Sequence, residues 1–240
     1  MITQEESARI LYGGFAPRDL PRYTLARAAR LVDVSPTTLR SWLRGRPYLR
    51  GGNVVHSAPL IKVDSDLLSF SHLVQVHILR SLRREEDVSM SRLRMAIEGA
   101  EKKHGITHLL LSEKLRSAPG EVLLDDYGEL INLGRAGQLA IRHALEAHLK
   151  RVDWDAQGPA QFFPGLVSVF ATPPQQEIPR LIVIDPSISF GRPVLASRKG
   201  IRVSAIVSRI DAGESEDAIA QDYGIERREV DAAIDYERAA

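Results

Sequence analysis

Cysteine is absent from this 240-residue chain. Without thiols there can be no disulfide bond and no thiolate metal site. Long apolar runs are missing as well, since no stretch approaches the roughly 20 residues that a transmembrane helix needs. The opening residues, MITQEESARI, are polar and acidic, unlike the basic and then apolar build of a secretory signal. We therefore expect a cytoplasmic protein that does not insert into a membrane.

Motifs for catalysis are also lacking. The sequence has no G-x-S-x-G elbow, no P-loop and no G-x-G-x-x-G run. Asp125 and Asp126 could be paired carboxylates, and they leave open a hydrolase or nuclease. Adjacent residues of a strand point to opposite faces, however, so a turn role is favoured for this pair. The prediction is a protein that is not an enzyme and needs no cofactor.

Histidine is the remaining candidate metal ligand. His104 and His108 have the i, i+4 spacing that would place both on one helical face. Gly105 lies between them and weakens the helix. A zinc site also needs a third and fourth ligand, and no H-E-x-x-H arrangement is present. No metal site is predicted.

Charge of both signs is present but unevenly distributed, although the formal net charge is only +1. Between Arg22 and Arg50 there are seven arginines and a single acid, Asp33. Between Arg192 and Arg209 there are five basic residues and no acid, whereas from Asp211 to Glu237 ten acids face two arginines. Such asymmetry indicates that different ends of the chain contact different partners.

The basic N-terminal segment has the pattern of a helix-turn-helix. Apolar residues at helical spacing follow the N-cap residue Thr24 as far as Val32. A second short helix begins at Ser35 and Pro36 and buries Leu39, Trp42 and Leu43. Trp42 is expected in the core rather than as a platform for bases. A β-hairpin, or wing, is expected next, with strands at Val54–Val55 and Leu60–Ile61. Helices over 69–84 and 89–104 complete this part.

The rest of the chain is predicted to hold a middle segment and a second helical domain. The apolar runs between Leu109 and Leu133 favour two or three antiparallel strands, and a helix over 137–151 and a proline-rich linker over 157–177 follow. After a strand at 181–184, three short helices are expected over 203–211, 215–223 and 226–236. The predicted fold class is mainly α: an N-terminal winged helix-turn-helix with a small antiparallel β extension, and a C-terminal three-helix, helix-turn-helix-like domain.

Residues 23–44, YTLARAARLVDVSPTTLRSWLR, with the basic wing and the two helices behind it, resemble the MerR-like winged helix-turn-helix. The resemblance implies that the second helix enters the major groove of double-stranded DNA, with Arg40 or Arg44 at a base edge. Serine and threonine hydroxyls near the helix start and the cations of the wing would then contact phosphates. The predicted DNA-binding residues are Thr37, Thr38, Arg40, Ser41, Arg44, Arg46, Arg50 and Asn53.

Residues 182–236 resemble a C-terminal domain family of antitoxins that is catalogued as a domain of unknown function. The shared pattern includes Gly191, Pro193, the stretch A-G-E-S at 212–215, and Tyr236. Together the two parts resemble the VapB-type antitoxins. That resemblance implies a partner toxin, a VapC-like ribonuclease with a PIN domain, and an autorepressor bound to operator DNA. The residues expected to meet the toxin are Arg192, Arg198, Lys199 and Arg202. The alternatives for this basic segment are a solvated turn and an auxiliary contact to DNA.

These resemblances suggest three parts: the MerR-like domain over 1–105, a β-rich extension with a helix and linker over 106–176, and the antitoxin-family domain over 177–240. A homodimer is expected, because paired reading helices about 34 Å apart match successive major grooves. The alternative within the same class is a free-standing MerR-like regulator whose C-terminal domain senses a ligand or dimerises.

Overall fold

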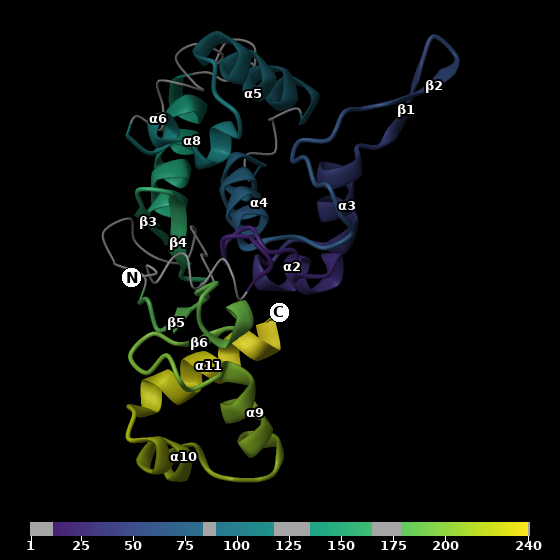
Figure 1. The fold of residues 1–240 in the computed structure, drawn as a ribbon. Helices are drawn as coiled ribbons and strands as arrows, with labels where there is room; N and C mark the ends of the chain where they lie inside the picture. The colour runs from purple at the N-terminus through teal and green to yellow at the C-terminus, as the bar shows by residue number, and fades with distance from the viewer. Residues whose placement is uncertain (1–11, 84–89, 118–134, 165–178, 240) are drawn as a thin grey trace. The chain divides into compact units, whose positions relative to one another are not determined.

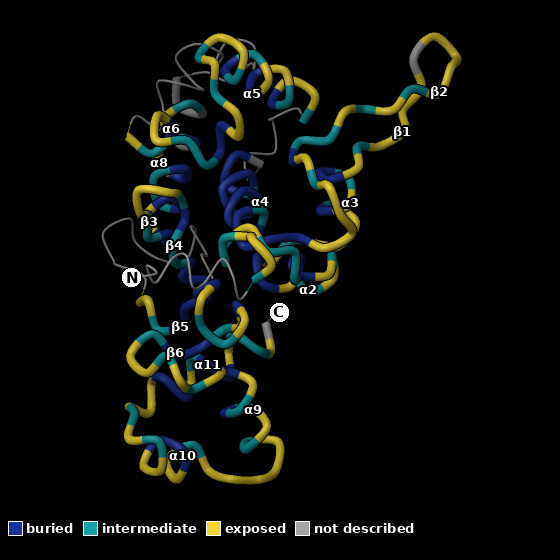
Figure 2. The backbone as a smooth tube through the Cα atoms, in the orientation of Figure 1, coloured by how far each residue is buried: buried dark blue, intermediate teal, exposed yellow. Residues whose placement is uncertain are grey.

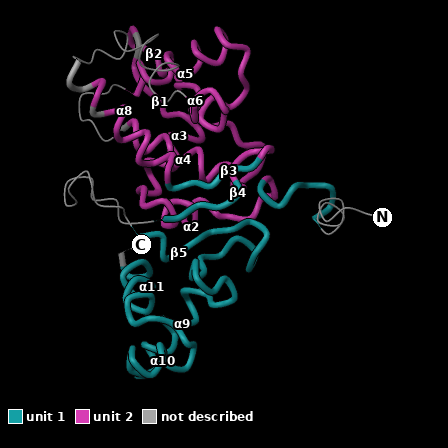
Figure 3. Tube along the Cα trace, turned by 90° about the vertical axis from the view of Figure 1, so that its left-hand side faces the viewer, with its two compact units in different colours: residues 1–18, 151–155, 160–240 teal, residues 19–150, 156–159 magenta. Residues whose placement is uncertain are grey.

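The computed structural model describes residues 12–83, 90–117, 135–164 and 179–239. These residues are mainly helical, with short antiparallel strand pairs, which confirms the predicted fold class. The chain divides into two compact units (Figure 3). Unit 2 consists of residues 19–150 and 156–159, and unit 1 of residues 1–18, 151–155 and 160–240.

Unit 2 begins with the predicted helix-turn-helix, formed by α2 (Leu25–Leu31) and α3 (Pro36–Arg44). The hydroxyl of Thr24 caps α2 by accepting from the Arg27 amide at 3.3 Å, and that of Ser35 caps α3 by accepting from the Thr38 amide at 3.2 Å. Pro36 occupies the first turn of α3, where its missing N–H has no cost. Both caps are confirmed. The buried side chains of the pair are Ala28, Ala29, Leu31, Leu39, Trp42 and Leu43.

The wing is a hairpin of β1 (Pro47–Arg50) and β2 (Asn53–His56), and it extends away from α3 (Figure 1). A hairpin is confirmed, and the predicted strand Val54–Val55 lies within β2, but the strand predicted to pair with it is wrong. The turn falls at Gly51-Gly52, whose φ angles of +58° and +80° suit the two central positions of a tight hairpin. Leu60 and Ile61 are not its second strand, because their amides donate to the carbonyl of Trp42.

Gly45 joins α3 to the wing at a point where the chain crosses itself closely. A Cβ at this position would lie 1.8 Å from the carbonyl oxygen of Ser57, and its φ is +71°. The wing base is also closed by the Arg46 amide, which donates to the Ser57 hydroxyl at 2.9 Å, and by the Ser57 amide, which donates to the Arg46 carbonyl at 3.0 Å. Only glycine fits here without moving the wing.

Behind the helix-turn-helix lie α4 (Phe70–Arg83), α5 (Met90–His104) and α8 (Arg135–Leu149), as predicted. Helix α4 is the most deeply buried element of unit 2 (Figure 2) and packs against α8. The two helices also meet through buried histidines, with the ring centroids of His77 and His148 4.7 Å apart. The start of α4 is tied to the helix-turn-helix by backbone hydrogen bonds between Tyr23 and Leu68.

The first of the strands predicted between Leu109 and Leu133 is wrong. Residues Leu109–Leu111 form the 3-10 helix η1, and α6 (Glu113–Ser117) follows. Leu109 and Leu110 are buried. A run of three leucines is equally compatible with a strand and with a buried helical turn, so its pattern could not separate them. The remaining predicted strands, like Asp125 and Asp126, lie outside the described residues.

Unit 1 contains short strands ahead of its helices. β3 (Val152–Asp155) pairs with β4 (Gly158–Phe162), so the prediction of a linker from residue 157 is wrong for its first residues. β5 (Ile182–Val183) pairs antiparallel with β6 (Val194–Leu195), and the 3-10 turn η3 (Ser189–Gly191) lies between them.

The buried guanidinium of Arg151 fastens the chain around these strands. Its Nε and Nη2 donate to the carbonyls of Phe163 and Pro164 at 2.8 and 3.1 Å, and Nη1 reaches the carbonyl of Pro179 at 3.5 Å. Burial, followed by the charge of Arg180, lowers the pKa of Arg151 to about 10, so the group still carries its charge at neutral pH.

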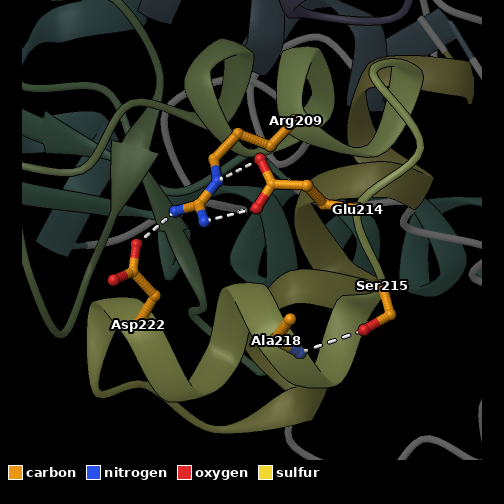
Figure 4. A network of polar contacts seen from close by, with 5 residues as sticks. All are labelled: Arg209, Glu214, Ser215, Ala218 and Asp222. Carbon is orange, nitrogen blue, oxygen red and sulfur yellow. Dashed lines mark hydrogen bonds and ion pairs between the residues drawn. The ribbon is translucent and has the colours of Figure 1, made fainter.

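The C-terminal part of unit 1 is the predicted set of three helices: α9 (Val203–Asp211), α10 (Glu216–Tyr223) and α11 (Arg227–Ala239). Ser215 caps α10 by accepting from the Ala218 amide at 3.2 Å (Figure 4). Gly224 ends the helix in the left-handed conformation. The helices pack around a shared apolar core that includes Val203, Ile206, Ile219, Val230, Ala233 and Ile234.

An ion-pair network fastens α9 to α10 (Figure 4). The guanidinium of Arg209 donates to both carboxylate oxygens of Glu214 at 2.8 and 2.6 Å and to Asp222 at 2.5 Å. The hydrogen bond from Arg209 lowers the pKa of Glu214. Arg209 belongs to the basic segment by sequence, but its charge is neutralised within the unit.

Candidate functional site

The outer face of α3 carries polar side chains, while its inner face supplies core residues. Leu39, Trp42 and Leu43 are buried, which confirms Trp42 as a core residue. On the opposite side Thr37, Arg40 and Arg44 are exposed, and their i, i+3, i+7 spacing places them on one stripe. The helix therefore presents cations and hydroxyls outward from a rigidly packed base.

Two of the predicted hydroxyl contacts already have partners on the helix itself. The Ser41 hydroxyl donates to the carbonyl of Thr38 at 2.7 Å, and the Ser35 hydroxyl donates to the Thr38 hydroxyl at 2.9 Å. Ser41 and Thr38 are half-buried, whereas Thr37 is exposed. Among the three predicted hydroxyls, Thr37 is the one whose side chain is fully available to a ligand.

The predicted arginines differ in how their charges are balanced. Within the described part of the chain, Arg40 and Arg46 form no ion pair, and both are exposed. Arg44 donates to Asp66 at 2.8 Å across an exposed pair. Such an exposed pair contributes about 0.2–1 kcal/mol, so Arg44 can exchange this carboxylate for a phosphate at little cost.

Two further observations bear on whether this surface can accept phosphates. Asp33, the single acid of the basic segment, is paired with Arg80 of α4, so it does not oppose the α3 arginines. On the wing, Asn53 is exposed, and the side chain of Arg50 lies outside the described part. Phosphate contacts by Arg46 and Asn53 are therefore sterically open.

Arg94 of α5 is a further cation that the sequence pattern did not indicate. Burial is the main cause that lowers its pKa, and the neighbouring charge of Arg46 lowers it further. The two arginines are thus close enough for their charges to interact. Helical periodicity shows only that Arg94 occupies a polar position of α5. Its distance to the wing depends on the tertiary packing of α5, which the sequence pattern does not give.

The second candidate surface is the basic loop of unit 1 around β6. Arg192 and Arg202 are exposed and form no ion pair with any residue in the described ranges. An antiparallel β-bridge joins Arg202 to Val194, and Val194 lies two residues after Arg192, so the backbone segments that carry the two arginines are neighbours. The head group of Lys199 lies 4.0 Å from the carboxylate of Asp185.

Arg198 lies against another part of unit 1, the end of helix α10. A Cβ added to Gly224 would lie 3.4 Å from its Nη2, so the guanidinium rests at the C-terminal end of α10. Cations are favoured there, because the last carbonyls of a helix carry partial negative charge. Of the predicted protein-binding residues, Arg192 and Arg202 are therefore the most available.

The acids of the terminal helices are largely engaged in ion pairs within unit 1. Arg227 pairs with Asp217 at 2.5 Å and also with Glu216 and Asp231. Arg228 pairs with Glu226. The helices remain acid-rich overall, and phosphate would meet repulsion on them.

A pocket of about 230 Å³ in unit 1 is lined by Arg18, by residues of β3 and β4, and by the segment 185–188 after β5. Its polar groups are bonded to one another. Arg18 donates to both oxygens of Asp155 at 2.8 and 2.7 Å, and Gln161 donates to Asp185 at 2.8 Å. These bonds fix the lining side chains, and nothing in the pocket points to a particular ligand for the ligand-sensing alternative.

The two histidines considered as metal ligands do not share a helical face. Helix α5 ends at His104, and Gly105 and His108 both have positive φ. Among the residues that the structure describes, no three His, Asp or Glu side chains gather closely enough to hold a metal ion. In the same residues, no helix is long and apolar enough to cross a membrane.

These features define a chain whose N-terminal part is a helix-turn-helix with exposed arginines on its outer face. Residues 21–97 match the family model described as "Putative DNA-binding HTH domain", and residues 182–236 match "Protein of unknown function (DUF433)". In Mycobacterium tuberculosis, "Putative antitoxin VapB45" is 27% identical over 236 residues, covering 90% of this chain and 94% of the relative. "Uncharacterized protein Rv2308" of the same organism is 27% identical over 219 residues, 89% of each chain.

The fold has a counterpart among solved structures. The X-ray crystal structure of Rv2018 from Mycobacterium tuberculosis aligns with a TM-score of 0.65, covering 90% of this chain and 99% of that one. At 22% identity this likeness shows a shared fold. The predicted resemblance to VapB-type antitoxins, with a helix-turn-helix at the N-terminal end and a domain of unknown function at the C-terminal end, is confirmed.

Proposed function

We propose that this chain is the antitoxin of a type II toxin–antitoxin module. It binds and neutralises a VapC-like PIN-domain ribonuclease, and it represses its own operon by binding operator DNA. The antitoxin name of the 27%-identical relative and the match to a DNA-binding domain support this proposal. No chemical step is part of it, and both partners would be met in the cytoplasm.

The observation that carries the DNA-binding half is the exposed stripe of α3. Arg40 projects from it without an ion pair in the described residues, next to the open hydroxyl of Thr37. An arginine at a base edge in the major groove discriminates its base by about 1–3 kcal/mol. Arg44, Arg46, Arg50 and Asn53 then contact the flanking phosphates, and Thr38 and Ser41 support them. Two chains in a dimer would place their α3 helices about 34 Å apart.

The basic loop of unit 1 supports the toxin-binding half. Four cations flank β6 in the sequence: Arg192, Arg198, Lys199 and Arg202. Arg192 and Arg202 have no carboxylate partner in the described residues. A guanidinium pairs with carboxylates in a fixed fork, so such a residue could block an acidic active site. Occlusion of the ribonuclease then needs no covalent change.

A titration of the ribonuclease tests the proposal. The proposal expects a PIN-domain protein encoded beside this chain; that protein is purified, and its cleavage of a labelled RNA is followed as the chain is added. We expect cleavage to stop near one chain per ribonuclease. Unchanged cleavage at tenfold excess, together with separate elution of the two proteins, would remove the antitoxin function and leave the free-standing regulator.

A further inference from the structure

A turn in unit 1 holds an aromatic side chain out into solvent. Phe190, in η3, is 75% exposed, the highest value among the large apolar side chains that the structure describes. Its backbone is left-handed, with φ at +56° and ψ at +36°. Ser189 and Gly191 on either side also have positive φ, at +47° and +67°. A bulky residue is strained in this region, so the fold holds Phe190 in an unfavourable backbone conformation.

Hydrogen bonds hold this turn firmly. The amide of Ile188 donates to the Asp185 carbonyl at 3.1 Å, and that of Gly191 donates to the Ile188 carbonyl at 2.9 Å. The buried carboxylate of Asp185 accepts from the Ser187 amide at 2.9 Å. The ring is therefore presented on a preorganised support, which reduces the entropy lost when a partner binds it.

The loop that follows the ring in the sequence is rich in cations. Arg192 follows two residues later, Arg202 lies across from Val194, and the head group of Lys199 is 4.0 Å from Asp185 at the base of the turn. Asp185 is the single acid between residues 179 and 210, and it is buried. An aromatic ring with arginines in the same loop has the composition of a protein-binding hot spot.

We propose that Phe190 is the apolar anchor by which unit 1 docks on its protein partner, entering a pocket that is apolar inside and lined with carboxylates at its rim. Charge complementarity points to such a rim, because Arg192, Lys199 and Arg202 belong to the basic loop that begins two residues after the ring. Nucleic acid is the less suitable occupant, since the same unit carries ten acids between Asp211 and Glu237. This inference rests on the proposed function, because the partner addressed is the ribonuclease.

Affinity measurements on the full-length chain test the anchor. Phe190→Asn removes the ring and keeps a residue that tolerates positive φ. We expect at least a tenfold weaker complex with the PIN-domain protein and a melting temperature no lower than that of the wild type, since the ring is mostly exposed. Phe15→Asn, at a half-exposed phenylalanine of the same unit, is the matched control and should change affinity less than twofold.

Salt separates the anchor from its charged rim. Raising NaCl from 0.1 to 0.5 M should reduce the effect of Arg202→Ala, because exposed charges are screened, and should leave the effect of Phe190→Asn intact. An unchanged affinity for Phe190→Asn while the wild type binds tightly would overturn the anchor alone. Weakened DNA binding in place of weakened protein binding would overturn it too. Failure of the wild type to bind the ribonuclease would overturn both the anchor and the proposed function.

Discussion

Replacing Arg40 by alanine should weaken binding to operator DNA with no loss of stability. Arg40 is exposed and has no ion pair within the described residues, so no intramolecular bond is lost in the variant. The change in unfolding free energy should stay within about 0.5 kcal/mol. A contact to a base edge is worth about 1–3 kcal/mol, which corresponds to a 5- to 150-fold loss of affinity for the operator and little loss on other sequences.

Fluorescence anisotropy measures these affinities on two duplexes. One contains the region upstream of the chain's own gene, and the other is a scrambled duplex of equal length and composition. Arg92→Ala, at an exposed arginine of α5 with no ion pair among the described residues, is the matched control for loss of one charge. Equal losses for Arg40→Ala and Arg92→Ala on the operator would refute the assignment of α3 as the reading helix.

The salt dependence distinguishes two kinds of contact. Loss of a phosphate contact lowers the slope of log affinity against log salt by about 1 and affects both duplexes equally. Loss of a base contact leaves the slope nearly unchanged and affects the operator selectively. An equal loss on both duplexes would reassign Arg40 to the DNA backbone.

Three further predictions follow from individual contacts. Asp66→Asn frees Arg44 from its 2.8 Å ion pair and should tighten DNA binding by about two- to fivefold, measured by fluorescence anisotropy. Weaker DNA binding by this variant would contradict a role for Arg44 at the DNA. Ser35→Ala removes the N-cap of α3 and should lower the unfolding free energy by about 1 kcal/mol in a urea titration, and no measurable change would show that this cap is dispensable. Glu214→Gln should lower the melting temperature at pH 7, because the hydrogen bond from Arg209 stabilises the ionised carboxylate and lowers the pKa of Glu214. The difference from the wild type should shrink as the pH falls below 4.5, since this contribution to stability is lost when Glu214 is protonated. A difference that stays constant with pH would contradict this.

The helices and their caps could be predicted because the signals are local. Ser35 followed by Pro36 marks the start of α3, and Ser215 and Gly224 mark the ends of α10, since each residue acts through backbone groups within four positions. The hairpin was expected, but its turn was placed after Val55, whereas the structure turns at Gly51-Gly52.

The missed features depend on contacts between distant residues. The pairing of β3 with β4 was hidden by the glycine and prolines that suggested a linker. Nothing in the sequence indicates that Arg44 meets Asp66, 22 residues later, or that Arg209 is neutralised while Arg192 stays exposed. Phe190 reads as an ordinary apolar residue, and only its positive φ and its exposure single it out.

Hydrogen–deuterium exchange of the full chain, with each partner in turn, tests the separation of the two surfaces most directly. With operator DNA, protection should appear over residues 36–56, in α3 and the wing, and exchange over 188–202 should stay as in the free chain. With the ribonuclease, protection should appear over 188–202 while 36–56 is unchanged. Protection of residues 216–239 by DNA, or of 36–56 by the ribonuclease alone, would contradict the assignment of DNA to unit 2 and of the toxin to unit 1.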